Sequence, residues 1–280
     1  MDYSLWIWLL PTGVNLLLDW LLIYRLHLGI AGAAWATVIA QAVSFCMSVL
    51  FFTRFSCQQF RGVRADRATV GRILTLGLPT LVQMGSLSVV LVVMNGLLAP
   101  RAGTVGVAAF GYVSRLAEFA LAPFSALCLA AAPIIGSSYG AGLHSRVRQT
   151  VVRTVQLGLV YAVVAVAVCY ALSGALLGIF TRDPAIVQFG THCLRRLAPA
   201  LLFLPPVLTV SAYFQSVNRA KSALVTAGAL PLCLCVGACL AAPLGTGAVW
   251  WAVPIAAAVC AVFCGALYIR QAGKRKRRAL

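Results

Sequence analysis

Acidic side chains are scarce in this sequence, with five aspartate and glutamate residues among 280, and charged residues of both signs make up only 10%. It contains no Walker sequence, no glycine-rich nucleotide-binding loop and no paired-carboxylate site, and its three histidines are dispersed. Nucleotide-driven transport and general acid–base catalysis depend on such groups. The sequence therefore predicts a protein that is not an enzyme and does not use ATP directly.

The spacing that marks a metal site is also lacking. The ten cysteines are scattered through apolar stretches, no CxxC pair occurs, and Cys233, Cys235 and Cys239 have no histidine or acid beside them. A zinc or redox site needs such pairing, whereas other buried thiols pack as small hydrophobic groups. We expect no transition-metal site and no organic cofactor.

Apolar length is what the sequence has in abundance. Hydrophobic residues amount to 62% and the mean hydropathy is +0.96. A helix needs about 20 apolar residues to cross a hydrocarbon core of about 30 Å. Eight stretches meet this need: 4–24, 30–53, 73–98, 104–137, 151–180, 186–217, 222–243 and 247–270. The predicted fold is all-α, a polytopic membrane protein with about eight transmembrane helices, in which prolines such as Pro199 permit kinks.

Basic residues are unevenly distributed over the segments between these stretches. Sixteen of the 22 lie after the second, fourth and sixth stretches and after the eighth, in the C-terminal tail. The positive-inside rule assigns these segments to the cytoplasm, so both termini are expected there, in a multi-pass protein of the plasma (inner) membrane. Topology and contact of the tail with anionic lipid account for the net charge of +17, and no nucleic-acid partner is expected.

A short internal repeat joins two distant parts of the chain. Residues 28–36 read LGIAGAAWA and residues 244–251 read LGTGAVWW, so that Gly32 aligns with Gly247 and Trp35 with Trp250. Each copy opens the second helix of a predicted hairpin, and internal repeats are common in secondary transporters. The second copy ends a run of six predicted helices, whereas the first ends a run of two. If each repeat holds six helices, four are missing before Met1; chance similarity is the alternative.

Several segments, in order, resemble those of the multidrug and toxic compound extrusion (MATE) transporters. They are residues 15–19, 29–41, 76–79, 108–115, 133–147, 179–184 and 214–221. MATE proteins have twelve helices in two six-helix lobes. The resemblance thus implies that residues 1–53 are the last two helices of the N-lobe, 54–72 a basic cytoplasmic linker, 73–270 a complete C-lobe and 271–280 a basic cytoplasmic tail.

Asp19 places a carboxylate inside an apolar stretch, with Asn15 one helical turn before it on the same face. An ionisable group within a membrane is costly and usually marks an ion or substrate pathway. If the chain turns near Arg25, Thr37 on the next helix returns to the depth of Asp19. Carboxylate, amide and hydroxyl oxygens suit Na⁺, and because burial favours a protonated carboxyl group, H⁺ is the alternative.

The resemblance implies the same role. MATE members that couple transport to ions through the N-lobe use an Asn–x3–Asp pair and a threonine at this spacing, which carries ion coupling onto Asn15, Asp19 and Thr37. They also use an aspartate on the family's first helix, which this chain does not contain. The alternative is that Asn15 and Asp19 only hydrogen-bond neighbouring helices.

Further polar residues lie inside the apolar stretches. Arg115 and Glu118 are three residues apart, and their simplest interpretation is an intrahelical ion pair, which lowers the cost of burying both charges. Alternatively, they face a central cavity and contact a substrate. Gln83, Asn95 and Gln215 are also candidates for this cavity, or bridge neighbouring helices.

The predicted function is secondary active export of organic compounds in exchange for Na⁺ or H⁺. We expect these compounds to be cationic. The alternatives are a lipid-linked sugar or polysaccharide flippase of the same superfamily and an inactive, truncated transporter remnant. The expected partners are membrane lipid and a small organic substrate, and the mechanism requires no oligomer.

Overall fold

The computed structural model describes residues 2–54 and 66–276, and over these residues the secondary structure is helical, with no strand. The N-terminal helices are α1 (Asp2–Asp19), the π-helix η1 (Trp20–Arg25) and α2 (Gly29–Arg54). They are followed by α3 (Arg67–Gly140), α4 (His144–Ala171), α5 (Ser173–Gly178), α6 (Pro184–Leu197), α7 (Ala200–Ser216), α8 (Ala220–Ala241), the 3₁₀-helix η2 (Ala242–Leu244) and α9 (Thr246–Lys276). The predicted all-α class is confirmed.

The chain divides into two compact units, Met1–Asp66 and Arg67–Leu280, called here the hairpin unit and the bundle unit. Most of the predicted linker, residues 55–65, lies outside the described residues. Its last residues, 67–72, form the first turns of α3, and the first part of the predicted tail, 271–276, continues α9. Residues 277–280 of that tail are not among the described residues.

Within the described residues, six helices are long and apolar enough to cross a membrane, and counting the bent pair α6–α7 as one span gives a seventh. The 74-residue α3 is counted once, but it consists of two helices separated by a non-helical residue, Gly103. A straight helix of that length would extend about 110 Å, far beyond a bilayer. Counting its halves separately gives the eight spans that the sequence predicts.

The break in α3 depends on Gly103. Its backbone has φ 57° and ψ −155°, a conformation that is costly for any residue with a Cβ. Pro100 precedes it, and the Arg101 guanidinium donates to the carbonyl of Leu97 over 2.9 Å, which satisfies a carbonyl at the end of the first half. The sequence GT at 103–104 thus ends one span and begins the next.

The predicted helix 186–217 is not continuous. It is divided into α6 and α7, which are bent by 52°. Pro199 has no N–H to donate to the preceding turn, and the chain continues there through i→i+3 bonds from Leu201 to Ala198 and from Leu202 to Pro199. At the other end of α6, Asp183 is the N-cap: its carboxylate accepts from the Ala185 N–H over 2.9 Å, with Pro184 in the first turn.

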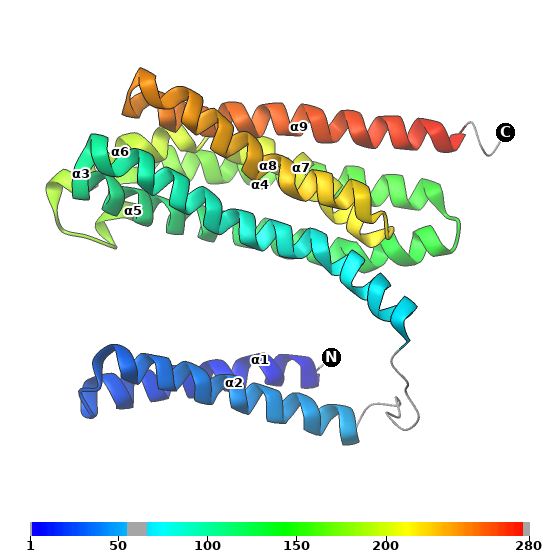
Figure 1. Cartoon of the computed structure of the whole chain (residues 1–280), viewed down its shortest axis with the longest axis horizontal. Coiled ribbons are helices and arrows are strands. Elements are labelled where there is room, and N and C mark those ends of the chain that lie inside the picture. The colour runs from blue at the N-terminus through cyan, green and yellow to red at the C-terminus, as the bar shows by residue number, and fades with distance from the viewer. Residues whose placement is uncertain (1, 55–65, 277–280) are drawn as a thin grey trace. The chain divides into compact units, whose positions relative to one another are not determined.

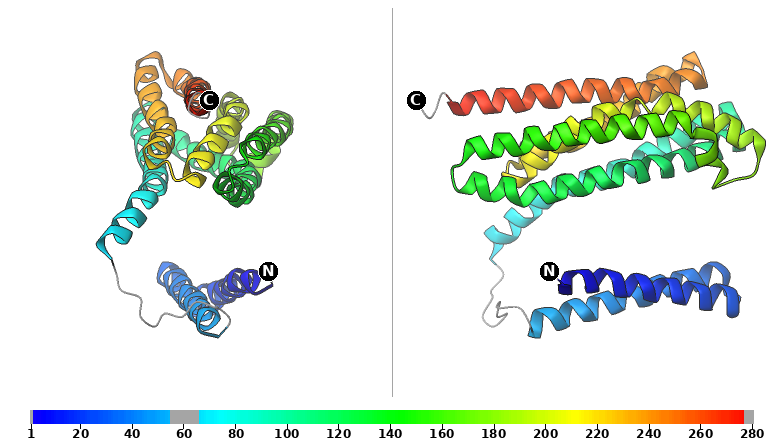
Figure 2. Two further views of the ribbon diagram at one scale, coloured as in Figure 1. Left: turned by 90° about the vertical axis from the view of Figure 1, so that its right-hand side faces the viewer. Right: turned by 180° about the vertical axis from the view of Figure 1, so that it is seen from behind.

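The helices of the bundle unit run roughly alongside one another around two buried clusters. One cluster surrounds Trp250 and Leu98, and the other surrounds Phe214 and Ile135. The start of α3, the α3–α4 turn, the α7–α8 turn and the C-terminal part of α9 lie at one end of this unit, and α5 and the α8–α9 turn lie at the other (Figures 1 and 2). The basic residues around positions 146–153, 219–221 and 270 therefore share one end.

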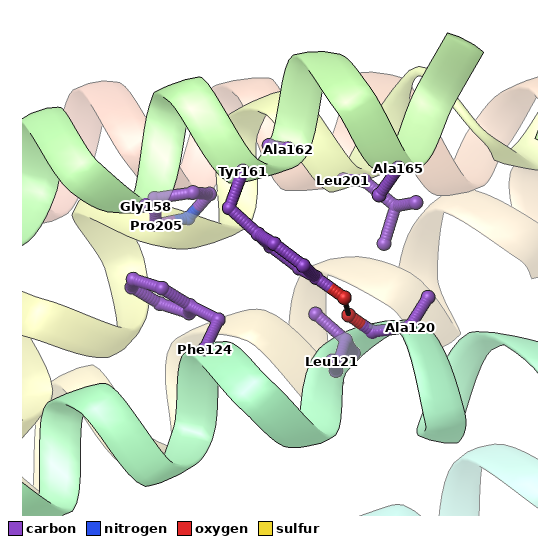
Figure 3. Close-up of a pocket in the computed structure, with 9 residues that line it drawn as sticks. All are labelled: Ala120, Leu121, Phe124, Gly158, Tyr161, Ala162, Ala165, Leu201 and Pro205. Carbon is purple, nitrogen blue, oxygen red and sulfur yellow. Dashed lines mark hydrogen bonds between the residues drawn. The ribbon is translucent and has the colours of Figure 1, made fainter. Parts of the chain in front are cut away.

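A close contact joins α3, α4 and α7 around Phe124 of α3. A Cβ at Gly158 would come within 2.2 Å of the Phe124 ring, so only glycine permits this approach. Beside it, the Tyr161 hydroxyl donates to the carbonyl of Ala120 over 2.8 Å (Figure 3). The small space between these side chains is closed by Leu201 and Pro205 of α7.

Candidate functional site

The hairpin unit brings the π-helix η1 against the start of α2. The chain turns at Leu26–Leu28, where His27 and Gly29 both have positive φ, so the turn expected near Arg25 is confirmed. Gly32 lies so close to η1 that an added Cβ would be 3.1 Å from the Leu22 carbonyl oxygen and from the Leu22 and Leu28 Cβ atoms. This contact holds the segment after Asp19 against α2.

Asp19 is the last residue of α1, and its backbone is the N-cap of η1 without a capping hydrogen bond from its side chain. Its Oδ1 atom is buried and has no hydrogen-bond partner among the described residues. The residue as a whole is half-buried, so this unpartnered oxygen costs about 1 kcal/mol relative to one that is hydrogen-bonded or bound to a cation. Such an atom in a helix that changes to π geometry is typical of a functional site.

Asn15 and Thr37 do not hydrogen-bond Asp19 within residues 2–54. Asn15 is half-buried, and the Thr37 hydroxyl, on an exposed residue, donates to the Ala33 carbonyl of its own helix over 3.0 Å. That bond uses the hydroxyl proton, so the lone pairs of the oxygen stay available as acceptors. The three residues thus retain oxygen atoms that can accept a proton or coordinate a cation.

Arg115 and Glu118 form the predicted intrahelical ion pair. A guanidinium nitrogen of Arg115 lies 2.8 Å from a carboxylate oxygen of Glu118, and the two side chains are 69% and 46% exposed. The pair has no net charge, and its surface exposure makes its contribution to stability small.

The amide side chains do not bridge helices in the described part of the chain. Gln215 is half-buried and donates to Ser211 of its own helix over 3.3 Å. Gln83 is half-buried and Asn95 exposed, and neither side chain hydrogen-bonds another described residue. The inter-helix bridges that the sequence suggested for these residues are therefore absent from residues 66–276.

The MatE family model matches residues 79–239, which is more than half of the chain. The chain belongs to the MatE family. The match begins at Pro79 in the first half of α3 and ends in α8, so it covers most of the bundle unit. With its apolar helices, this assignment identifies the chain as a multi-pass membrane protein.

Among curated relatives, the multidrug export protein MepA of Staphylococcus haemolyticus is 26% identical over 255 residues, which cover 89% of this chain and 56% of MepA. MepA of Staphylococcus aureus strain N315 is 24% identical over 263 residues, or 91% of this chain and 57% of MepA. This MatE chain thus spans a little over half the length of the curated relatives it matches.

Solved structures confirm the fold. A MATE crystal structure in the straight conformation superposes with a TM-score of 0.89 at 22% identity, covering 98% of this chain and 64% of that chain. A MOP-superfamily transporter from Pyrococcus furiosus gives a TM-score of 0.84 at 23% identity, over 92% of this chain and 60% of that chain. The binding pocket of that protein is described as having reverse polarity.

The sequence does not indicate one feature of this MatE chain, the π-helix beside Asp19. In η1, the Leu26 N–H donates to the Leu21 carbonyl, five residues back, over 3.1 Å, and the Arg25 guanidinium lies 5.5 Å from the centre of the Trp20 ring. In the sequence, this π-helix is marked only by the spacing of Trp20 and Arg25. The two residues are five apart, which matches a cation–π contact across one π-helical turn.

Proposed function

We propose that this MatE chain acts in secondary active export of organic cations, driven by Na⁺ or H⁺ that binds at Asp19. The observation that carries the proposal is the buried Asp19 Oδ1 atom without a hydrogen-bond partner among the described residues. A proton or a cation at this oxygen removes the penalty of burying it. The exported compounds are proposed from the family, whose curated relatives are multidrug export proteins.

The energetics of this coupling follow from the ion gradient and the membrane potential. Each positive charge that moves inward releases about 2.3 kcal/mol per 100 mV, and each positive charge on the exported compound costs the same amount on its way out. A one-for-one exchange with a monovalent cation is therefore driven by the concentration gradient of the ion, and the potential contributes only if more positive charge enters than leaves. By linkage, the ion drives export only if it binds one access state more tightly than the other. The side chain of Asp19 meets this requirement if the burial of its carboxylate differs between the two states.

The direction of transport depends on topology. The basic residues at one end of the bundle unit support a cytoplasmic location for that end, and with it for the C-terminus, under the positive-inside rule. We extend this to the N-terminus, because an even number of spans precedes the C-terminus. The membrane proposed is the plasma (inner) membrane.

The proposal is tested with everted membrane vesicles from cells that produce the full chain and lack their own drug exporters. Ethidium is the probe, and a Na⁺ or a proton gradient is imposed in separate experiments. We expect ethidium transport under one of the two gradients, and Asp19→Asn should lower its rate at least tenfold. Asp183→Asn is the matched control, because it also removes one carboxylate charge, keeps an oxygen acceptor at the N-cap of α6 and leaves the hairpin unit unchanged.

A second measurement separates ion binding from export. Hydrogen–deuterium exchange of the α1–α2 segment is compared in Na⁺, in K⁺ and at two proton concentrations. The coupling ion should slow exchange in this segment for the unmodified chain and not for Asp19→Asn. Export that is unchanged in Asp19→Asn removes this residue from the mechanism. Failure of the unmodified chain to export ethidium, combined with flipping of a lipid-linked sugar, would favour the flippase; failure in both assays would favour the inactive remnant.

A further inference from the structure

A groove runs along the first turns of α4, at the basic end of the bundle unit, away from Arg115 and Glu118. Its volume is about 600 Å³, and it lies between α3 and α4. The α4 side carries polar groups as well as Leu157: Arg146, Gln149, Thr150, Arg153 and Thr154. The α3 side is entirely apolar: Leu127, Ala130, Ala131 and Ile134.

A second hollow of about 420 Å³ adjoins this groove along α4. It shares Gln149 and Arg153 with the groove and adds Arg148 and Gln156. Three arginines and two amides, all of them hydrogen-bond donors, thus lie within eleven residues of one helix, numbered 146–156. Donors of this kind bind phosphate oxygens, and arginine does so in a bidentate manner.

The positive charge of the groove is not neutralised within the described part of the chain. No ion pair among residues 2–54 and 66–276 involves Arg146, Arg148 or Arg153. The Thr150 hydroxyl donates to the Arg146 carbonyl over 2.9 Å, so it offers only its lone pairs to a ligand. These exposed arginines therefore favour a ligand that brings negative charge.

The two groove arginines both lie in the first three turns of α4. Arg146 and Arg153 are seven residues apart, on the same face of α4, with a rise of about 10 Å between them. Because helical side chains lean toward the N-terminus, both long arginine side chains lean toward the basic end of the bundle unit. The two arginines thus line the same side of the groove, next to its apolar part.

The apolar part continues toward the middle of the bundle unit. Leu157 is 58% exposed and Ile134 is 45% exposed, so both present hydrocarbon to whatever fills the groove. A groove between α8 and α9 provides a contrast: it is larger, about 740 Å³, and its lining is almost wholly apolar, with no charged residue. That surface offers only hydrocarbon, whereas the α3–α4 groove also offers arginines.

We propose that the α3–α4 groove binds an anionic phospholipid, with the phosphate between Arg146 and Arg153 and an acyl chain along Leu127, Ile134 and Leu157. A lipid is favoured over free phosphate because half of the lining is hydrocarbon. A zwitterionic lipid fits less well because its headgroup cation faces the arginines. The inference does not depend on ion coupling at Asp19.

The test is native mass spectrometry of the full chain released from micelles that contain equal amounts of phosphatidylglycerol and phosphatidylcholine with identical acyl chains. The unmodified chain should retain phosphatidylglycerol preferentially. The double substitution Arg146→Gln/Arg153→Gln should weaken that binding about 30-fold, at about 1 kcal/mol per arginine and 1.4 kcal/mol per factor of ten. Phosphatidylcholine binding should not change.

The charge control is Lys221→Gln/Arg270→Gln. It removes two exposed positive charges from the same end of the bundle unit without contacting the groove. Its effect should stay below threefold, and an equal loss in both double variants would overturn the proposal, because general attraction would then explain the preference. Inorganic phosphate that displaces the lipid at millimolar concentration would also overturn it, in favour of a free-anion site.

Two substitutions that add bulk test the apolar side of the groove. They keep the proposal falsifiable if the double arginine variant does not fold. Ala130→Phe fills the groove and leaves every charge in place, so phosphatidylglycerol binding should fall at least tenfold. Leu129→Phe is the control, since Leu129 is 77% exposed and does not line the groove. Equal binding by the Ala130→Phe and Leu129→Phe variants would contradict the proposed position of the acyl chain.

Discussion

The hairpin unit and the α8–α9 pair begin their second helices with similar sequences but bury them very differently. Trp250 is 1% exposed and packs on Phe110, with ring centroids 5.9 Å apart, whereas the corresponding Trp35 is 62% exposed. Phe110 belongs to α3, for which the hairpin unit has no equivalent among its described helices. The repeated sequence thus places a tryptophan at the same position of both helices. Whether that tryptophan is buried depends on the neighbouring helices.

The repeated glycines differ in the same way. Gly32 lies against backbone and Cβ atoms of η1 and the turn, which cannot move aside, whereas a Cβ at Gly247 would meet a guanidinium nitrogen of Arg196 at 2.9 Å. A long side chain can rotate away from such a contact. Close packing within the hairpin unit is therefore local, between a helix and its own turn, and in the bundle unit it joins α6 to α9.

The tryptophans should give the largest difference between the two regions. Trp250→Ala is expected to lower the free energy of unfolding by about 3–5 kcal/mol, and Trp35→Ala by less than about 0.5 kcal/mol. Unfolding in mixed micelles, followed by circular dichroism, measures both. Trp250→Phe should lower the free energy of unfolding much less than Trp250→Ala. The buried indole N–H has no partner among the described residues, so its removal breaks no hydrogen bond. Equal losses for the two alanine variants would show that Trp35 is covered.

A second pair of substitutions should have effects of opposite sign. Gly158→Ala forces a Cβ into the Phe124 ring and should cost about 1–3 kcal/mol. Gly13→Ala, within α1, meets no atom within 4 Å and should gain about 0.5–1 kcal/mol from the higher helix propensity of alanine. The midpoint of thermal unfolding should fall for Gly158→Ala and rise for Gly13→Ala; a fall in both would mean that α1 contacts a further surface at Gly13.

The repeated glycines provide a third, smaller contrast. Gly32→Ala should destabilise the hairpin unit by about 1 kcal/mol, since the Leu22 carbonyl cannot move away. Gly247→Ala should be neutral within about 0.5 kcal/mol, because Arg196 can change rotamer. Hydrogen–deuterium exchange resolves the two regions in separate experiments on the two variants. A larger increase in exchange, relative to the unmodified chain, in α9 of Gly247→Ala than in α2 of Gly32→Ala would contradict this expectation.

The smallest effects are expected at the two carboxylates. Asp19→Asn removes the charge of a half-buried carboxylate whose Oδ1 atom has no described partner, and should raise the free energy of unfolding by up to about 1 kcal/mol in Na⁺-free buffer at neutral pH. Glu118→Gln breaks an exposed ion pair and should lower it by no more than about 0.5 kcal/mol. A loss of stability in Asp19→Asn would indicate instead that the carboxylate stabilises the hairpin through a hydrogen bond.

Several features of the site were predictable because they depend on neighbours in the chain. The Arg115–Glu118 pair follows from i,i+3 spacing on one helix, and the division near Pro199 from a missing N–H. The unpartnered state of Asp19 and the π-helix after it were not predictable, since the burial of one oxygen depends on which atoms the folded chain places around it. The α3–α4 groove was also unpredictable, although Arg146 and Arg153 are conspicuous in the sequence, because its apolar side comes from another helix.

By itself the sequence determined the number and approximate limits of the membrane-crossing helices, because apolar length and proline position act within a single segment. It also placed two carboxylates, Asp19 and Glu118, inside apolar stretches, where a membrane protein rarely has them. Only the tertiary structure decided which side chains are covered, which oxygen is buried and where arginines face hydrocarbon. These properties depend on the surfaces of two or more helices, and no local pattern specifies how such surfaces meet.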